Sequence, residues 1–157
     1  MPSTPADVTR YRRFLRSGMP GPHAYVVLLG LNRFDFPSLA EQIGKGLPFS
    51  ALERFQKSSS LTQAQLLDLV QIAPRTLARR KTEGRFSPEE SDRLVRAARV
   101  YGRALEFFDG DTDAATTWLT EAQRAFGGDT PLDVARTDPG AAEVERLIGQ
   151  LEYGVLP

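Results

Sequence analysis

The stretch Arg75-Thr76-Leu77-Ala78-Arg79-Arg80-Lys81 decides the fold expected for this chain, because a basic segment here follows an amphipathic one. Pro74 cannot continue the first segment as a helix, but it suits the first turn of a second helix. Two short helices around a tight turn are therefore predicted, with Leu77 facing the core and Arg75 and Arg79 on one exposed face. The first segment has apolar residues at helical spacing: Leu66, Leu67, Leu69, Val70 and Ile72.

The basic second helix predicts a contact with nucleic acid. Helix-turn-helix proteins meet base edges and phosphates with a cationic face close to a helix start. A solvated basic helix is the alternative that composition alone leaves open. The residues expected to contact DNA are Arg75, Thr76, Arg79, Arg80 and Lys81.

Composition bounds the other possibilities. A chain of 157 residues that is 41% hydrophobic can bury a core, in one domain or in two small ones closely packed. The absence of cysteine excludes disulfides and thiolate metal sites, and His23, the single histidine, cannot build a metal site alone. The longest apolar run, Ala24–Leu31, is too short for a membrane span, and the N-terminus lacks the order of a signal peptide. A cytoplasmic protein without membrane contact is expected.

Charge is segregated along the chain although the net charge is zero. Residues 1–74 carry a net +3, residues 75–103 a net +5, and residues 104–157 a net −8. A cationic surface attracts phosphate and an acidic one repels it, so the two regions are expected to bind different partners.

The N-terminal region gives weaker signals. Met1–Pro22 is polar, and its arginines predict either a solvated terminus or an arm that contacts phosphates. Tyr25–Leu31 is too short to distinguish a buried strand from a buried helix. Leu39, Ile43 and Leu47 recur at four-residue spacing, which predicts a short helix that ends at the glycines 44 and 46.

A strong helix start follows the basic segment. Ser87 is an expected N-cap, Pro88 suits the first helical position, and Glu90 closes a capping box. The long helix that begins there should join a DNA-binding module to the last third of the chain. One of its faces is apolar and contains Leu94, Ala98, Tyr101, Leu105 and Phe108, while Asp92, Arg96, Arg99 and Arg103 share another.

The last third repeats a capped short helix. Caps are expected at Asp111, at Thr130 and at Asp138. After Gly154 the chain ends in the apolar residues Val155, Leu156 and Pro157, although chain ends are normally polar. Either this tail folds back on the core or a partner receives it.

Catalytic signals are absent from the sequence. No histidine lies near the many carboxylates of the last third, and no glycine-rich phosphate loop follows a strand. The run Asp109–Asp113 has some features of a calcium loop, but Thr120 stands where the bidentate Glu is needed. We therefore expect a protein that is not an enzyme and needs no cofactor.

The order of these motifs resembles the Xre-type antitoxins of RES-Xre toxin-antitoxin pairs, with the antitoxins called MbcA and ParS as relatives. The resemblance covers about residues 46–155, and the N-terminal region falls outside it. Its motifs are Arg75–Lys81, Gly84–Ser87, Glu90–Leu94, Ala115 with Trp118-Leu119, Gly127–Asp133, and Gly140 onward to Glu152-Tyr153-Gly154-Val155.

The resemblance implies a Cro-like helix-turn-helix that binds the promoter of its own operon and a C-terminal domain that binds the toxin. It implies that the partner is a RES-domain toxin that degrades NAD, and that the end of the antitoxin blocks the toxin's active-site cleft. The residues that it assigns to toxin binding are Glu152, Tyr153, Gly154, Val155, Leu156 and Pro157.

Three positions depart from the pattern. Leu67 stands where such units commonly have Ala, so the two helices are expected to lie further apart. Gln71 stands where glycine is common and must form the turn without glycine's conformational freedom. Glu121–Gln123 replaces a Pro-Asn pair after Trp118-Leu119, which predicts that this helix runs on.

The sequence therefore predicts an all-α antitoxin that represses its own operon, as a homodimer and in a higher-order toxin-antitoxin complex. Its expected parts are a variable arm and packing region (1–45), a Cro-like helix-turn-helix domain (46–100) and a small helical toxin-binding domain (101–157), with a long helix as the joint. The alternative is a free-standing transcription regulator with a C-terminal protein-interaction domain.

Overall fold

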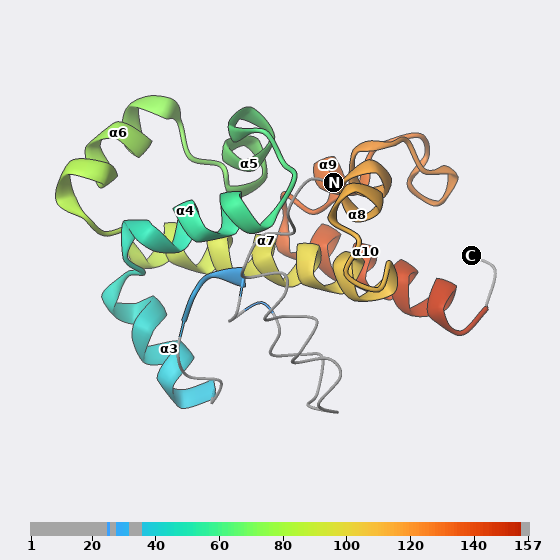
Figure 1. Ribbon diagram of the computed structural model, residues 1–157, viewed down its shortest axis with the longest axis horizontal. Coiled ribbons are helices and arrows are strands. Elements are labelled where there is room, and N and C mark those ends of the chain that lie inside the picture. Colours follow the sequence, from blue (N-terminus) through green and yellow to red (C-terminus); the bar gives the residue numbers. More distant parts are fainter. Residues whose placement is uncertain (1–24, 26–27, 32–35, 155–157) are drawn as a thin grey trace.

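The computed structural model describes residue 25, residues 28–31 and residues 36–154. Within that part of the chain the secondary structure is helical, apart from one antiparallel bridge between Pro48 and Arg85 (Figure 1). This confirms the predicted all-α class. The helices are α3 (Phe36–Lys45), α4 (Phe49–Ser58), α5 (Gln63–Val70), α6 (Pro74–Glu83), α7 (Pro88–Phe107), α8 (Thr112–Thr120), the short 3-10 helix η2 (Arg124–Phe126), α9 (Pro131–Val134) and α10 (Asp138–Glu152).

Three features expected from the sequence lie outside the described residues. They are the arm Met1–Pro22, the histidine His23 and the tail Val155–Pro157. No helix in the described part of the chain is long and apolar enough to cross a membrane.

Helix α7 runs through the middle of the molecule and packs against elements from both halves of the chain (Figure 1). Four residues of its predicted apolar face, Leu94, Ala98, Tyr101 and Leu105, are fully buried. The fifth, Phe108, is the C-cap residue just past the end of the helix and is partly buried against the core. Helices α3 and α5 contact it from the N-terminal half, and α8 and α10 contact it from the C-terminal half. One long helix therefore joins the two halves of the chain, as its periodicity predicted, and its apolar side chains belong to a single core rather than to two.

The segment that the sequence left open between strand and helix has helical backbone at two of its described residues and then turns at Leu29 and Gly30. Tyr25 and Leu28 have helical backbone, and the Leu29 N–H donates to the Tyr25 carbonyl at 3.1 Å. Leu28, Leu29 and Leu31 are buried. This short segment contributes to the same core that α7 organises.

Helix starts agree with the capping signals at most positions. Ser87 forms the predicted capping box, and Asp111 and Thr130 cap α8 and α9 with their side chains. The structure adds a second complete capping box at Thr62, which begins α5. Two predictions were wrong. Asp138 was expected to cap α10, but it is the first residue of that helix. The cap is Thr137, whose hydroxyl accepts from the Gly140 N–H at 3.1 Å.

The second error concerns the end of α8. The sequence predicted that this helix runs on past Trp118-Leu119, but it stops at Thr120 because Glu121 adopts an extended backbone. The Gln123 side chain then donates to the carbonyl of Trp118 at 3.3 Å, which stabilises the end of the helix.

Candidate DNA-binding and toxin-binding surfaces

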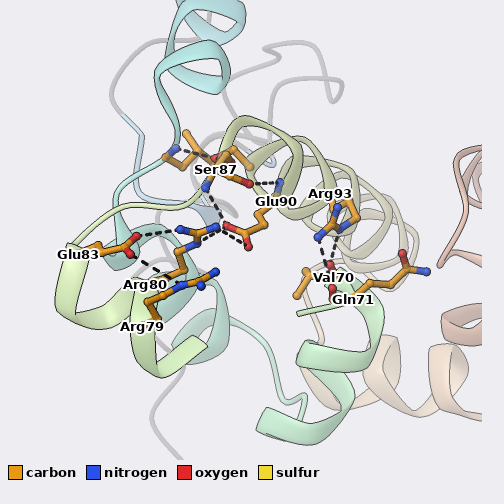
Figure 2. Close-up of polar contacts among 10 residues, drawn as sticks. Val70, Gln71, Arg79, Arg80, Glu83, Ser87, Glu90 and Arg93 are labelled. Atoms are coloured by element: carbon orange, nitrogen blue, oxygen red, sulfur yellow. Dashed lines mark hydrogen bonds and ion pairs between the residues drawn. The ribbon is translucent and has the colours of Figure 1, made fainter. Parts of the chain in front are cut away.

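The bend between α5 and α6 is built around Gln71. As the sequence predicted, this residue forms the turn without being glycine: its backbone is left-handed, with φ of 55° and ψ of 47°. The Ile72 N–H donates to the carbonyl of Leu67 at 3.0 Å, which closes the end of α5. Arg93 of α7 donates from Nε to the carbonyl of Val70 at 2.8 Å (Figure 2). The two helices and α7 are thus joined at the bend.

Helix α6 presents a basic exposed side and a single buried anchor. Leu77 is only 9% exposed and holds the helix on the core, as predicted. Arg75, Arg79 and Lys81 are exposed, and Thr76 is half-buried. Arg79 makes only a loose exposed ion pair with a carboxylate on its own helix, at 3.8 Å, so its guanidinium can reorient toward a ligand.

Arg80 lies differently from its neighbours on α6. Its side chain is 19% exposed, and Nε donates to Glu90 Oε1 at 2.7 Å, while Nη1 donates to Glu83 Oε2 at 2.8 Å (Figure 2). These hydrogen bonds to Glu90 and Glu83 raise the pKa of Arg80. Glu90 is the residue that also closes the capping box of α7 with Ser87. Arg80 therefore anchors α6 to α7, a role that its position in a basic run did not reveal.

An apolar cleft of about 530 Å³ lies between α4, α5 and α6. Leu67, the residue expected to hold the two helices apart, lines it together with Leu77 and Pro74. Phe49 and Leu52 of α4 line the opposite wall. The cleft is a feature of the helix-turn-helix itself, next to the basic side of α6.

The polar face of α7 forms a ladder of ion pairs with α10. Arg99 Nε lies 2.8 Å from Glu145 Oε1, and Arg96 Nη1 lies 4.0 Å from Asp138 Oδ1. Farther along both helices, Arg103 reaches Glu152. These arginines are part of the basic region and the carboxylates part of the acidic region, so a share of the charge that is segregated in sequence is neutralised between the two helices in the fold.

The end of α10 is held by the last pair of that ladder. Arg103 binds Glu152 in a two-pronged geometry, with Nη1 to Oε1 and Nη2 to Oε2 both at 3.1 Å. Burial alone would lower the pKa of Arg103, but the hydrogen bonds and charge of Glu152 and Glu106 outweigh burial and raise it. The direction in which the chain leaves the helix is therefore set by a pair between α7 and the last residue of α10.

Beyond this pair the chain turns outward. Tyr153 is 86% exposed, an unusual position for a large aromatic side chain. Gly154 follows with a left-handed φ of 69° and is also exposed. Of the residues expected to bind toxin, Glu152, Tyr153 and Gly154 are thus described, and Val155–Pro157 are not.

Sequence patterns gave no sign of one residue that joins the two halves. The carbonyl of Arg136, between α9 and α10, accepts from Gln71 Nε2 at 3.2 Å and from Arg96 Nη2 at 3.4 Å. Its guanidinium lies 3.5 Å from Asp68 of α5. No short-range signal could have found these contacts, since they join residues that are 40 or more positions apart in the sequence.

Fold and surfaces together define a class of protein: a helix-turn-helix module joined by a shared long helix to a small helical domain. Residues 38–99 match the family described as "Antitoxin Xre-like helix-turn-helix domain", and residues 103–154 match the "Antitoxin Xre/MbcA/ParS C-terminal toxin-binding domain". The chain belongs to the Xre antitoxin family.

Curated relatives agree with this assignment. A protein named Antitoxin Xre from Yersinia enterocolitica is 37% identical over 118 residues, which is 74% of this chain and 80% of the relative. Another Antitoxin Xre, from Photorhabdus laumondii, is 33% identical over 76% of this chain and 82% of its own length. A protein of Sphingobium sp. strain YBL2 named "Prs ADP-ribosylating antitoxin" is 27% identical over 93% of this chain and 95% of its own length.

Proposed function

We propose that this antitoxin neutralises an NAD-degrading RES-domain toxin by placing its C-terminal end in the toxin's active-site cleft, and that it represses its own operon by binding operator DNA. The chain itself supplies no catalytic step in this proposal. The functional assembly is a homodimer that joins a higher-order complex with the toxin. The protein works in the cytoplasm, where NAD and the operator are both present.

The toxin-binding part of the proposal rests on the geometry at the end of α10. Arg103 and Glu152 fix the last turn of that helix, and Tyr153 projects from it with 86% of its surface exposed. A rigid base with an exposed aromatic side chain is typical of an interface anchor, because little conformational freedom is lost on binding. The apolar residues Val155, Leu156 and Pro157 follow directly and would add apolar area in a cleft.

The nature of the toxin's substrate is supported by a relative's name. The Sphingobium relative is named for ADP-ribosylation, a reaction whose usual donor is NAD, so an NAD-dependent partner suits a chain that is similar along 155 residues. A cleft that admits NAD is large enough to receive a short extended peptide. Inhibition would then be steric competition between the tail and NAD.

The DNA half of the proposal rests on the exposed side of α6. The exposed positions of Arg75, Arg79 and Lys81 on α6, with Thr76 half-buried beside them, support contacts with bases and phosphates. Arg80 belongs to the same basic segment, but its ion pairs with Glu90 and Glu83 support a role in holding α6 in position.

The decisive experiment for the toxin half is deletion of residues 155–157 in a strain that carries the adjacent toxin gene. The shortened antitoxin should still co-purify with the toxin, because the helical surface is intact, while NAD hydrolysis by the complex should partly return. A shortened antitoxin that suppresses NAD hydrolysis as fully as wild type would refute active-site blocking by the tail. An adjacent gene that does not encode a RES-domain protein would favour the free-standing regulator.

A further inference from the structure

The bend of the helix-turn-helix is joined to a segment far outside it. Within residues 63–83, all of which the structure describes, Gln71 alone has a left-handed backbone. That conformation is normally costly for a residue with a side chain. Its side chain compensates by donating from Nε2 to the carbonyl of Arg136 at 3.2 Å. Figure 2 shows the Gln71 side chain extending away from Arg93, so the bend is held from two sides.

Arg136 stands between α9 and α10, within the part of the chain that matches the toxin-binding domain. Its carbonyl accepts a second hydrogen bond from Arg96 of α7 at 3.4 Å, which fixes that carbonyl against the long helix. Its guanidinium pairs with Asp68 in the last turn of α5 at 3.5 Å. One residue of the C-terminal domain therefore contacts α5, the bend and α7 together.

We infer that Arg136 is a positioning residue for DNA binding: through Gln71 and Asp68 it sets the angle at which α6 leaves α5. The exposed cations of α6 can meet successive phosphates and base edges only if that angle is right, since a displacement of about 1 Å breaks a hydrogen bond. The functional DNA-binding module thus extends beyond residues 38–99 to the connection between α9 and α10. This inference rests on the DNA-binding half of the proposed function.

The substitution Gln71→Gly separates positioning from simple stability. Glycine adopts the left-handed backbone freely, so the folded protein should be at least as heat-stable as wild type, while the link to Arg136 is lost. Binding to a fluorescent duplex of the DNA upstream of the operon should nevertheless weaken by about fivefold, because the free protein must then order α6 on binding, at a cost of ~1 kcal/mol. A residue with a merely structural role would not give unchanged or higher stability together with weaker DNA binding.

A second pair of variants tests the Arg136 side chain. Asp68→Arg and Arg136→Asp should each lower the preference for the duplex over a shuffled one of equal length, a ratio in which general attraction to phosphate cancels, and the double variant should recover part of that preference because the ion pair is re-formed with reversed polarity. Arg146→Ala is the matched control, because this exposed arginine pairs only within α10 in the described structure. Hydrogen exchange at the Ile72 amide, which bonds to Leu67, should be faster in Arg136→Asp than in Arg146→Ala.

The outcomes separate this inference from the proposed function. If wild type binds the duplex, Arg79→Ala weakens binding and Gln71→Gly binds as wild type does, then positioning by Arg136 is refuted while DNA binding stands. If wild type does not prefer the duplex over a shuffled one of equal length, the DNA half of the proposed function fails. In that case unchanged Ile72 exchange in Arg136→Asp would refute the positioning contact as well.

Discussion

Arg80 Nε lies 2.7 Å from Glu90 Oε1, and this pair joins the end of the basic helix α6 to the first turn of α7. The same Glu90 oxygen accepts the Ser87 N–H at 2.8 Å, which closes the capping box of α7. Burial alone would raise the pKa of Glu90, but the hydrogen bonds from Arg80 and Ser87 outweigh burial and lower it. One nearly buried carboxylate thus holds the relative position of two helices.

Glu90 should make stability depend on pH in the acid range. Because its pKa is lower in the folded chain than the usual 4.5, its stabilising contribution is fully present above that value and is lost as pH falls through the folded value. The Tm of wild type should therefore fall more steeply between neutral pH and about pH 3 than the Tm of Glu90→Gln. Glu89→Gln, at an exposed neighbouring position, should follow wild type. Parallel curves for wild type and Glu90→Gln would contradict the prediction.

Arg79 and Arg80 should differ in what their loss does. Arg79→Ala should weaken binding to the operon's upstream DNA by about 1–3 kcal/mol if it contacts a base, or reduce the log-log salt slope by about one if it contacts a phosphate. Its Tm should be unchanged, because its ion pair is long and exposed. Arg80→Ala should lower Tm, because Glu90 is left nearly buried without its partner. Gel shifts at matched salt with equal affinity for wild type and Arg79→Ala would end its assignment to the DNA surface.

Tyr153 and Arg103 should both matter for toxin binding, for different reasons. Tyr153→Ala removes an exposed anchor and should weaken binding by about 2 kcal/mol or more, without changing Tm. Arg103→Ala frees the end of α10 and should lower both toxin affinity and Tm. Arg103→Lys should keep only part of the wild-type affinity and Tm, since lysine cannot form the two-pronged pair with Glu152. Calorimetric titration with inactive toxin measures the affinities, with Lys45→Ala, an exposed position on α3 outside the matched toxin-binding domain, as control. Wild-type affinity for Tyr153→Ala would move the interface away from the end of α10.

Gly46 and Gly44 should respond to alanine in opposite directions. At Gly46 the backbone has a φ of 85°, and an added Cβ would collide with the carbonyl oxygen of Phe86, so Gly46→Ala should lower the free energy of unfolding by more than ~1 kcal/mol. At Gly44, inside α3, a Cβ meets nothing within 4 Å, and Gly44→Ala should be neutral or stabilising. Urea unfolding of the two variants makes the comparison. A stable Gly46→Ala protein would show that the bridge between Pro48 and Arg85 can shift to make room.

Local signals in the sequence were sufficient for most of the helices. The capping boxes at Thr62 and Ser87, the proline at the start of α6 and the glycine after it act within a few residues, so they operate in nearly any tertiary context. The apolar face of α7 was equally visible, since periodicity reports burial directly. The one misplaced cap was Asp138, which is the first residue of α10, and Thr137 before it caps the helix.

Sequence by itself therefore determined an all-helical architecture, the basic segment on α6 and the long shared helix. Only the tertiary structure decided which charges are available to partners. Arg80 is engaged with Glu90, Arg103 with Glu152, and the carbonyl of Arg136 with Gln71. The physical reason is that a charged side chain in a sequence has no partner until distant helices are packed, and the packing of α7 against α10 and of the bend against Arg136 is a property of the whole fold.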